Sequence, residues 1–524
     1  MALSLPHSIL QGTNTPQVII LLLSLTFLYA LIHLARTYKK LSHIPGPFWS
    51  RLTNLPRVSW VRSKRAHEIH LALHEKHGEI VRFGPNMVSL SNPAWIPALY
   101  PARAGFPKSK FYKVLAPWTP SGGALPAVFS STDENVHKNL KTPIASLYSM
   151  SKILPLEPFV DKTLDVLCQE LDSRFVETKK VFDLADWLQF FAFDVMGTLT
   201  FSKRYGFLER GVDVGGVLGV IWGFLAGSAV FTQVPWFDKI WNKNVFMARF
   251  HKKAGPGILG IVGKYVAERQ EAQSKKDDAL SATDTTDKLR RRDMLDSFLE
   301  IQRSGGLPPW TVTAWTFSNI LAGSDSTAVV IRTAFYNLLT HPAHLLKLRA
   351  ELTSASASLP TGFSKPYPSY KEICDLPYLD AVVLEALRMH PPFALPFERV
   401  VPTGGISIGG EFFPEGTVLG MSAYVVNRHQ GAFGEDAGVW NPERWMVEKE
   451  VKSRREAAVL TFGAGRRVCL GRHIAMLELK KIVPALVLRY DFEIQDAKRY
   501  QVENCWFFRQ YGMDVTVKKR DCGL

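Results

Sequence analysis

The stretch at residues 462–471, FGAGRRVCLG, constrains this chain more than any other part of its sequence. It places a single cysteine, Cys469, in a loop rich in glycine and arginine, just before an apolar helical run at residues 474–488. The glycines allow tight turns and let the backbone approach a flat ligand closely. The neighbouring arginines and the amides that begin the next helix favour a thiolate, the form of cysteine that binds metal. No second cysteine lies nearby to complete a zinc or iron–sulfur site, so we expect one anionic sulfur ligand.

At this loop the chain resembles the cytochromes P450, whose haem-binding signature is Phe-x-x-Gly-x-Arg-x-Cys-x-Gly. The matching residues are Phe462, Gly465, Arg467, Cys469 and Gly471. The resemblance implies a haem b group (iron-protoporphyrin IX) held by the thiolate of Cys469, a ligand that favours O–O bond cleavage. For the loop alone, the alternative is a buried core cysteine beside a turn.

The resemblance covers nearly the whole chain and implies the cytochrome P450 fold preceded by one transmembrane helix. Hydrophobic periodicity independently predicts a mainly α protein with small β-sheets. Helices are expected at residues 63–77, 161–176, 184–199, 214–231, 258–270, 295–301, 310–339, 344–352 and 378–389. Short strands are expected at residues 80–83, 87–90, 405–412, 417–421 and 514–518.

Residues 18–35 form an apolar run near the lower length limit for crossing a bilayer. Residues 1–17 contain no Lys or Arg, whereas residues 36–65 contain eight of them and no acidic residue. The positive-inside rule then places the chain after Arg36 in the cytosol. The alternative is a cleaved signal peptide, but its basic start and its small-residue cleavage site are missing. We therefore expect an uncleaved, single-pass anchor in the endoplasmic reticulum membrane.

The anchor divides the chain into three expected parts. Residues 1–35 form the anchor, residues 36–50 a basic, proline-rich hinge, and residues 51–524 one haem-thiolate monooxygenase domain. Five scattered cysteines without a CxxC pair indicate a reducing compartment. The net charge of +15 fits anionic membrane lipid and an acidic electron-donor protein. We expect no nucleic-acid partner, because no basic helix or aromatic-interleaved basic patch accompanies the charge.

Two further segments allow more than one interpretation. Residues 214–231 carry no charge and have glycines at every fourth position from Gly215 to Gly227. They form either a second membrane span with a close-packing face or a buried or membrane-grazing helix of the fold, which the absent basic flank favours. The polar, charged residues 274–292 predict a surface loop.

Glu385 and Arg388 lie three apart on a helix that Pro391 must end, so their side chains share a face and can pair. Arg444 follows in the segment NPERW. The resemblance assigns these residues to the family's Glu-Arg-Arg triad, a structural group that helps to shape the haem pocket. A solvated helical salt bridge is the alternative for the first two residues alone.

The polar cluster AGSDST at residues 322–327 interrupts a long apolar helix. Ala322 and Ser326, four apart, lie on one face, and Gly323 beside them would leave room for a small ligand. The resemblance gives Asp325 and Ser326 a catalytic role as a proton relay for O₂ activation. Serine replaces the threonine usual in the family and is less fixed in rotamer, which puts the coupling efficiency in question. A helix kinked by small polar residues is the alternative.

Haem propionates need cationic partners. The resemblance assigns this role to Arg467 and Arg399. It extends the role to His137 and Lys141, which stand where the family often has Trp-x-x-x-Arg. A solvated helix face is the alternative for that pair.

The family positions of the substrate pocket fall on residues 106–129, 315–325, 393–397 and 506–508. These segments are rich in aromatic and apolar residues, which favours an apolar, medium-to-large substrate. Aromatic residues at such positions also occur as plain core.

The segments SYKEICDLPYLDAVVLEALRMHPP and NPERW are most similar to fungal members of the pisatin-demethylase-like, microsomal type. The resemblance implies a monooxygenase that inserts one atom of O₂ into a small molecule by hydroxylation, epoxidation or demethylation, in secondary metabolism or detoxification. Without a flavin or nicotinamide fingerprint in the chain, its electrons would come from NADPH-cytochrome P450 reductase, with cytochrome b5 as a second donor. The alternatives are a haem-thiolate isomerase or dehydratase and a non-catalytic haem sensor.

Overall fold

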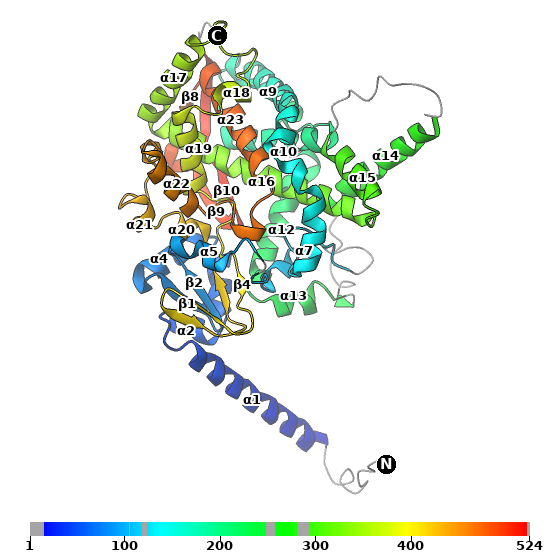
Figure 1. Cartoon of the computed structure of the whole chain (residues 1–524), viewed down its shortest axis with the longest axis vertical. Helices are drawn as coiled ribbons and strands as arrows, with labels where there is room; N and C mark the ends of the chain where they lie inside the picture. Colours follow the sequence, from blue (N-terminus) through cyan, green and yellow to red (C-terminus); the bar gives the residue numbers. More distant parts are fainter. Residues whose placement is uncertain are drawn as a thin grey trace.

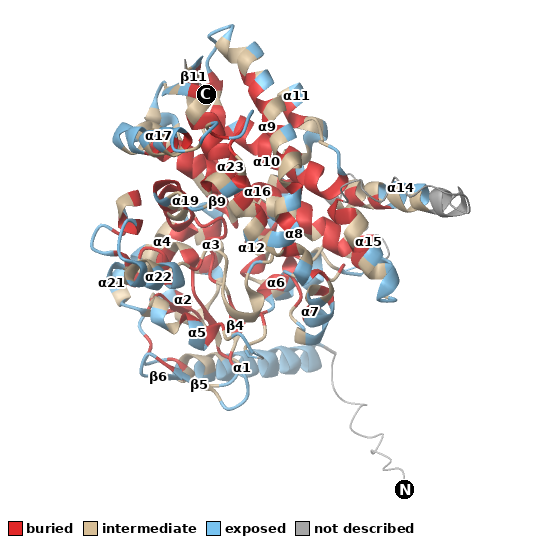
Figure 2. Ribbon diagram, turned by 45° about the horizontal axis from the view of Figure 1, so that its top comes forward, coloured by how far each residue is buried: buried red, intermediate tan, exposed pale blue. Residues whose placement is uncertain are grey.

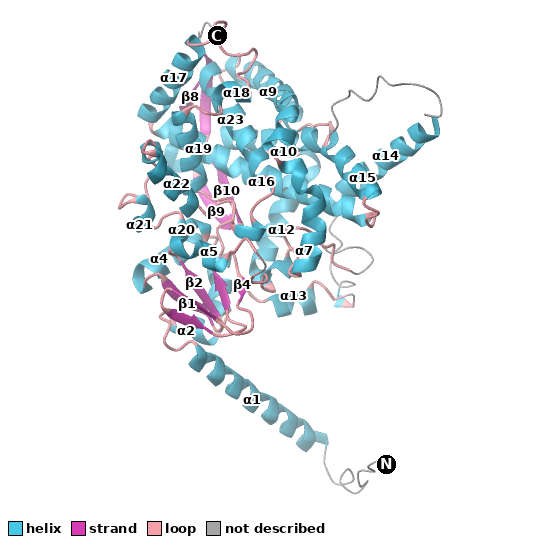
Figure 3. Cartoon of the chain, viewed as in Figure 1, coloured by secondary structure: helices cyan, strands magenta, loops and turns pink. Residues whose placement is uncertain are grey.

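The computed structural model describes residues 15–103, 105–117, 123–244, 246–247, 257–279 and 293–520. Helices make up most of the molecule, and the strands form small sheets at its lower end and along its core (Figure 3). The predicted class, mainly α with small β-sheets, is confirmed.

The long helix α16 (Trp310–Thr340) runs through the centre of the molecule (Figure 1). It packs against α10 (Leu184–Phe201), α19 (Pro377–Met389) and α23 (Arg472–Arg489). A helix that is apolar on nearly all sides must be covered on all sides. Figure 2 accordingly shows these helices largely buried.

The remaining helices surround this centre. They are α2 (Phe48–Leu52), α3 (Leu55–Arg62), α4 (Ala66–His77), α5 (Ile96–Leu99), α6 (Phe111–Val114), α7 (Glu134–Lys141), α8 (Met150–Ile153), α9 (Glu157–Leu171), α11 (Phe207–Arg210), α12 (Val217–Thr232), α13 (Pro235–Trp241), α14 (Gly257–Ala279), α15 (Met294–Ser304), α17 (Pro342–Ala357), α18 (Tyr370–Ile373), α20 (Ala423–Val426), α21 (Gln430–Phe433) and α22 (Lys449–Ala458).

Four small sheets accompany the helices. The largest has the strand order β1 (Ile80–Gly84), β2 (Met87–Leu90), β7 (Val418–Gly420) and β4 (Arg399–Val400), with β2 and β7 parallel. The others are β3 (Phe182–Asp183) with β11 (Asp514–Lys519) and β8 (Tyr490–Ile494), β9 (Gln501–Cys505) with β10 (Phe507–Tyr511), and β5 (Ile406–Ile408) with β6 (Glu411–Phe413).

Helix α1 (Thr15–Lys40) projects from the body next to the β1–β2 end of the molecule (Figure 1). Its large apolar side chains are exposed, Leu23 at 64% and Phe27 at 66%. Among the described residues, two helices are long and apolar enough to cross a membrane: Pro16–Lys40 and Val214–Thr232.

The second of these helices is part of the fold. Helix α12 buries one face, with Ile221 and Leu225 in the core, and packs against α3, α13 and α14. Its glycines do not form a close-packing face, because open space surrounds Gly223 and Gly227. These contacts support the interpretation of α12 as a helix of the fold.

Two local predictions were wrong. The strand expected at residues 405–412 is a hairpin of β5 and β6, because Gly409 and Gly410 at its middle take positive φ and reverse the chain. Of the loop expected at residues 274–292, the first six residues continue helix α14, and residues 280–292 lie outside the described residues.

Candidate active site

The Cys469 loop is closed on itself and docked against the preceding part of the chain. The amide of Cys469 donates to the carbonyl of Phe462 at 2.8 Å, and the amide of Arg466 donates to the carbonyl of Pro101 at 3.1 Å. Gly465 has φ +61°, and a Cβ at this position would overlap the carbonyl oxygen of Tyr100. Only glycine fits here, so this signature residue is required by the close contact between the loop and the chain at Tyr100.

The sulfur of Cys469 is open to a ligand but lies below the molecular surface. Its side chain is exposed, whereas desolvation by the surrounding protein raises the pKa of the thiol. Backbone amides of Gly471 and Arg472 at the start of α23 donate to it and oppose this rise, as do the charges of Lys141 and Arg472. The helix start therefore favours a thiolate as expected. Arg466 and Arg467 both pair with Glu134.

Helix α7 brings two predicted residues to this loop. Lys141 donates from Nζ to the carbonyls of Arg466 and Val468, at 2.8 and 3.3 Å. His137 is buried, its Nδ1 has no hydrogen-bond partner among the described residues, and burial with nearby cations lowers its pKa to about 3. Lys141 thus holds the cysteine loop in place, and His137 is a neutral donor or acceptor beside it.

Arg399 reaches the same region from β4. It is buried, donates to the carbonyl of Glu398 at 2.9 Å, and lies 4.9 Å from the centre of the Tyr100 ring. The Glu398 carboxylate does not pair with it, because that group accepts from Arg57 at 2.9 Å and Ser109 at 2.5 Å.

We call the basic side chains around the loop the cation cluster; they are Lys108, Lys141, Arg399, Arg466 and Arg467. Glu134 pairs with Arg466 and Arg467, and a small pocket is lined by Arg399, Arg467 and Glu134, among other residues. Positive charge exceeds negative charge in this buried region, which needs anions for balance. The region fits a flat group with two carboxylates, such as haem.

The centre of α16 presents one accessible face. Ala322 is exposed although its helix is buried, and Ser326, on the same face, donates from Oγ to the carbonyl of Ala322 at 2.6 Å. Gly323 points elsewhere, because a Cβ there would meet Met196 of α10 at 2.6 Å. Its small size serves helix packing, and the predicted role of Gly323 in leaving ligand space was wrong.

Asp325 is buried next to this face. It accepts from Gln189 of α10 at 2.7 Å, and its second oxygen has no hydrogen-bond partner among the described residues. Burial raises the pKa of Asp325 to about 6, while Arg332 and Gln189 oppose the rise. A carboxyl group that titrates near pH 6 can both hold and release a proton under physiological conditions. The sequence did not reveal Gln189.

Three of the expected pocket segments meet in an aromatic cluster of Phe111, Phe129, Phe393 and Trp506. Ring centres lie 5.2 Å apart for Phe393 and Trp506, 6.1 Å for Phe129 and Phe393, and 6.0 Å for Phe111 and Trp506. Phe129 is 41% exposed, so the cluster has an open side.

Two other aromatic side chains expected at the pocket belong to the core. Trp315 is buried and donates to the carbonyl of Leu140, and Phe508 packs between His67 and His390. Residues 118–122 of the expected pocket lie outside the described residues.

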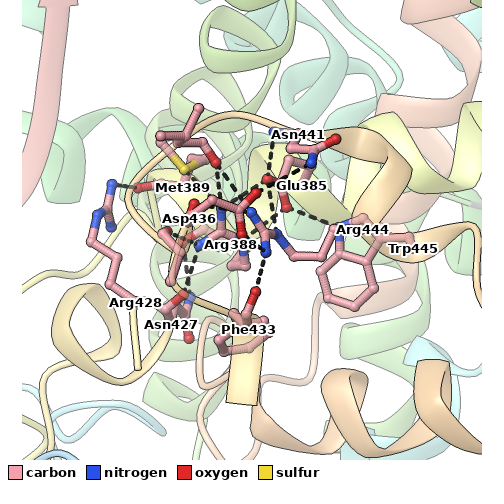
Figure 4. A network of polar contacts seen from close by, with 12 residues as sticks. Glu385, Arg388, Met389, Asn427, Arg428, Phe433, Asp436, Asn441, Arg444 and Trp445 are labelled. Atoms are coloured by element: carbon pink, nitrogen blue, oxygen red, sulfur yellow. Dashed lines mark hydrogen bonds and ion pairs between the residues drawn. The ribbon is translucent and has the colours of Figure 1, made fainter. Parts of the chain in front are cut away.

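The structure brings Glu385, Arg388 and Arg444 together (Figure 4). Arg388 binds both oxygens of Glu385, at 2.7 and 2.8 Å, and Nε of Arg444 lies 3.5 Å from the same carboxylate. Arg388 also donates to the carbonyls of Asn427 and Val439, at 2.9 and 3.0 Å. All three side chains are buried.

Three further residues complete this network and were missed as site residues from the sequence. Trp445 donates from Nε1 to Glu385 at 2.9 Å, the amide of Asn441 donates to it at 2.8 Å, and Asp436 accepts from Arg444 at 2.8 Å. The segment around Arg444 supplies Asn441 and Trp445, so the spacing of that segment was the signal that could have found them.

The comparisons with known proteins agree on one family. The family model described as Cytochrome P450 matches residues 44–511. The chain is 66% identical to "Cytochrome P450 monooxygenase pkfB" of Emericella nidulans over 500 residues, which cover 95% of this chain and 96% of that protein. It is 57% identical to "Cytochrome P450 monooxygenase asR2" of Sarocladium schorii over 488 residues, 93% of this chain and 94% of the relative. "Cytochrome P450 monooxygenase mfmA" of Annulohypoxylon moriforme is 52% identical, with 94% of each chain covered.

Proposed function

The chain belongs to the cytochrome P450 family, and on that premise we propose that it inserts one atom of O₂ into an apolar small molecule. It has the P450 fold and is an oxidoreductase that uses O₂, as its relatives are monooxygenases. Members of the family hold haem through a cysteine thiolate, take electrons from a redox partner and bind small-molecule substrates. The proposed reaction is hydroxylation, epoxidation or demethylation in fungal secondary metabolism or detoxification.

The observation that carries this proposal is the geometry of Cys469. Its thiol is open to a ligand and accepts hydrogen bonds from backbone amides at the start of α23. Its loop packs against Tyr100 so closely that only glycine fits at position 465. When bound there, haem b would supply the activation of O₂. The Phe462 carbonyl accepts from the Cys469 amide, and the Gly471 amide donates to the sulfur. Arg399, Arg467, His137 and Lys141 are the proposed partners of the propionates.

The proposed role of Asp325 and Ser326 is to move protons toward the reacting oxygen. Ser326 presents its hydroxyl on the accessible face of α16, and Asp325, with a pKa raised to about 6, is next to it in the chain. Gln189 holds the Asp325 carboxylate in place. The aromatic cluster around Phe129 and Trp506 provides an apolar wall for substrate.

We propose residues 1–35 as the membrane anchor, residues 36–50 as the hinge and residues 51–524 as the monooxygenase domain on the cytosolic side of the endoplasmic reticulum. The exposed apolar length of α1 supports the anchor. Exposed aromatic side chains on α13, at Trp236 and Phe237, and at Trp49 on α2 add apolar surface that lipid would cover. The proposed electron donors are NADPH-cytochrome P450 reductase and cytochrome b5.

The test of the haem assignment is Cys469→Ser in the full-length, microsomal protein. We expect loss of the red-shifted band in the reduced carbon-monoxide difference spectrum, because serine oxygen donates far more weakly than thiolate. Cys374→Ser is the matched control and should keep the band. Retention of the band in Cys469→Ser would contradict the assignment.

Electron use separates monooxygenation from the two alternatives. A monooxygenase consumes NADPH through the reductase and forms an oxygenated product, whereas an isomerase or dehydratase turns over without NADPH and a haem sensor forms no product. Metabolite profiling by mass spectrometry in a strain lacking this chain would identify the compound that accumulates and hence the substrate.

The test of the topology is protease treatment of intact microsomes. We expect digestion of the domain after residue 50 without detergent, because it faces outward. Protection of that domain, or release of the chain by carbonate extraction, would contradict the single-pass, cytosolic arrangement.

A further inference from the structure

A larger cavity, of about 340 Å³, lies between α10, α11, α12, α14 and α16. Small-molecule sites in proteins have volumes of about 300–1,000 Å³, so this cavity is large enough for a ligand. None of the described residues that line it belongs to the cysteine loop, the cation cluster or the aromatic cluster. On α16 it is lined by Ile320, which lies about 200° round the helix from Ala322. The cavity is therefore on the other side of α16 from its accessible face.

Aromatic rings form one wall of this cavity. The ring centres of Phe193 and Phe207 lie 5.5 Å apart. Tyr205 continues the row, with its ring centre 6.0 Å from that of Phe207 and 6.3 Å from that of Tyr265. These distances are typical of aromatic rings in contact. Val217 of α12 adds an aliphatic surface, so the interior of the cavity suits an apolar body.

Hydrogen bonds of the fold hold these walls in place. The buried carboxylate of Asp194 accepts from the amides of Tyr205 and Leu208, at 2.8 and 2.9 Å, and fixes the turn that follows α10. Arg269 of α14 donates to the carbonyl of Phe201 at 3.1 Å and joins that helix to the end of α10. The cavity is thus already formed without a ligand, and a ligand would not have to order it.

The rim of the cavity carries more positive than negative charge. Lys203, Lys264 and Glu268 line it and are exposed. Lys264 and Glu268 pair with each other at 3.8 Å. Lys203 lies 5.6 Å from the centre of the Tyr265 ring and has no acidic partner among the described residues. One lysine at the opening is therefore available to an anionic group.

The other acids near Lys203 are already in use. Glu209 pairs with Arg204 at 2.7 Å. Asp213 accepts two backbone amides at the start of α12, both at 3.0 Å. Asp194 accepts amides of the turn, as described above. An anion at the rim would thus meet Lys203 without displacing a partner from the protein.

We propose that this cavity binds an amphiphile with an apolar body and a single carboxylate group, and that Lys203 holds the carboxylate at the rim. The aromatic and aliphatic walls contact the body, because burial of apolar surface is the main source of affinity in such a site. One unpaired lysine balances the single charge of a carboxylate, whereas a phosphate monoester carries close to two charges at pH 7. The site lies apart from the haem-thiolate chemistry, so this inference goes beyond the proposed function and does not depend on it.

The probe that tests it is dodecanoic acid with a photoreactive diazirine at its ω end, applied to the full-length holoenzyme. After irradiation, mass spectrometry of the peptides identifies the labelled residues. We expect label on the cavity walls, at Ile261 and Tyr265 of α14 and at Val217 of α12. Unlabelled dodecanoate and dodecanol then compete for this label. The ratio of their inhibitory concentrations measures the preference for the acid.

Charge variants test the contact with the carboxylate. Lys203→Met should lower the preference for dodecanoate over dodecanol by about two- to fivefold, the effect of one exposed ion pair. Lys203→Glu should lower it further, because two carboxylates would then face each other, and Lys203→Arg should keep it. Lys180→Met, at an exposed lysine that does not line the cavity, is the matched control and should keep it as well.

Space-filling variants test the location. Val217→Trp places a large side chain in the cavity, so labelling of its walls should fall about tenfold or more through loss of buried apolar contact. Val220→Trp is the matched control, because Val220 is on the same helix, is 47% exposed and does not line the cavity. Its labelling should match the wild type. Circular dichroism shows whether each variant folds, and Ile261→Phe replaces Val217→Trp if that variant does not.

The proposal is wrong if the cavity walls are not labelled, or if Val217→Trp is labelled like the wild type. Label confined to the aromatic cluster around Trp506 would mean that the acid binds only as a substrate, and it would overturn the proposal as well. An unchanged preference for dodecanoate in Lys203→Met would show that the site does not select a carboxylate. Failure of the proposed function would appear instead in the wild-type carbon-monoxide spectrum and would leave the labelling result unaffected.

Discussion

Two groups of buried charges in this protein differ in whether the chain itself neutralises them. In the triad, the Glu385 carboxylate accepts hydrogen bonds from Arg388, Asn441 and Trp445. Arg444 also donates to a second carboxylate, that of Asp436. In the cation cluster, Glu134 pairs with Arg466 and Arg467, whereas Lys108 and Arg399 bind carbonyls and aromatic rings.

The difference separates a structural role from a binding role. A closed network of buried charges is satisfied before any ligand arrives, so its function is to fix the chain around it. An open set of like charges is satisfied only when something negative binds, which marks a functional site. Asp325 is likewise not satisfied by the chain, because burial raises its pKa and one of its oxygens has no hydrogen-bond partner among the described residues.

The largest expected effect is in the closed network. Glu385→Gln should lower the free energy of unfolding by about 3–5 kcal/mol, because it leaves Arg388 buried without a counter-charge. Urea denaturation followed by tryptophan fluorescence measures the loss. Glu443→Gln is the matched control: its partner Lys347 is half-exposed, so the loss should stay below about 1 kcal/mol. Equal losses in the two variants would contradict the distinction between the networks.

Asp325→Asn should change stability in the opposite direction. The folded-state pKa of Asp325 is about 6 and the ordinary value is 3.8, so the folded state binds a proton that the unfolded state releases. This preference stabilises the protein at low pH and is lost as pH rises from about 4 through about 6. At pH 7 the charged, buried carboxylate therefore costs roughly 3 kcal/mol.

Removing that charge should make Asp325→Asn more stable than the wild type at pH 7.5 and equally stable near pH 4, while coupling of NADPH use to product falls. Denaturation curves at the two pH values measure the stability change. A variant that is destabilised at both pH values would place Asp325 with the triad as a structural residue.

The sequence predicted helices better than strands. Long segments with helical periodicity, such as α10, α16 and α19, were found within a few residues of their ends. The hairpin of β5 and β6 was merged into one strand because the Gly409-Gly410 turn was not recognised. Strands β9 and β10 were missed. They are defined by their antiparallel pairing with each other, and their residue pattern alone did not indicate strands.

For the site, local motifs were readable and distant partners were not. Cys469 and the pair of Glu385 and Arg388 lie within short patterns whose spacing implies their chemistry. Gln189 lies 136 positions from Asp325, and Lys108 meets Arg399 only through the β-bridge. Long-range pairing depends on packing of the whole chain, which no local pattern encodes.

Ser326→Ala tests the accessible face of α16 with a smaller expected effect. Proton transfer by a positioned group is typically worth ~10²–10⁴-fold, but water partly replaces a lost hydroxyl. We expect a several-fold fall in product per NADPH, more peroxide, and an unchanged carbon-monoxide spectrum. Thr327→Ala is the control, because Thr327 is buried about 100° further round the helix. If Ser326→Ala kept the wild-type yield of product per NADPH while Thr327→Ala lost it, the proton-relay hydroxyl would be that of Thr327.

The smallest effect is expected for Glu134→Gln, which removes an acid from the open cluster. Its side chain is 26% exposed, so solvent screens the charges and the loss of unfolding free energy should stay below about 1 kcal/mol. Without Glu134, Arg466 and Arg467 are free to bind an anion, so transfer of haem to apomyoglobin should become slower. The same substitution at Glu385 costs stability, because its arginines are fully buried and have only the protein to balance them. If Glu134→Gln destabilised the protein as much as Glu385→Gln and released haem faster, the cluster would be a second structural network, and no ligand would be needed to explain its charge.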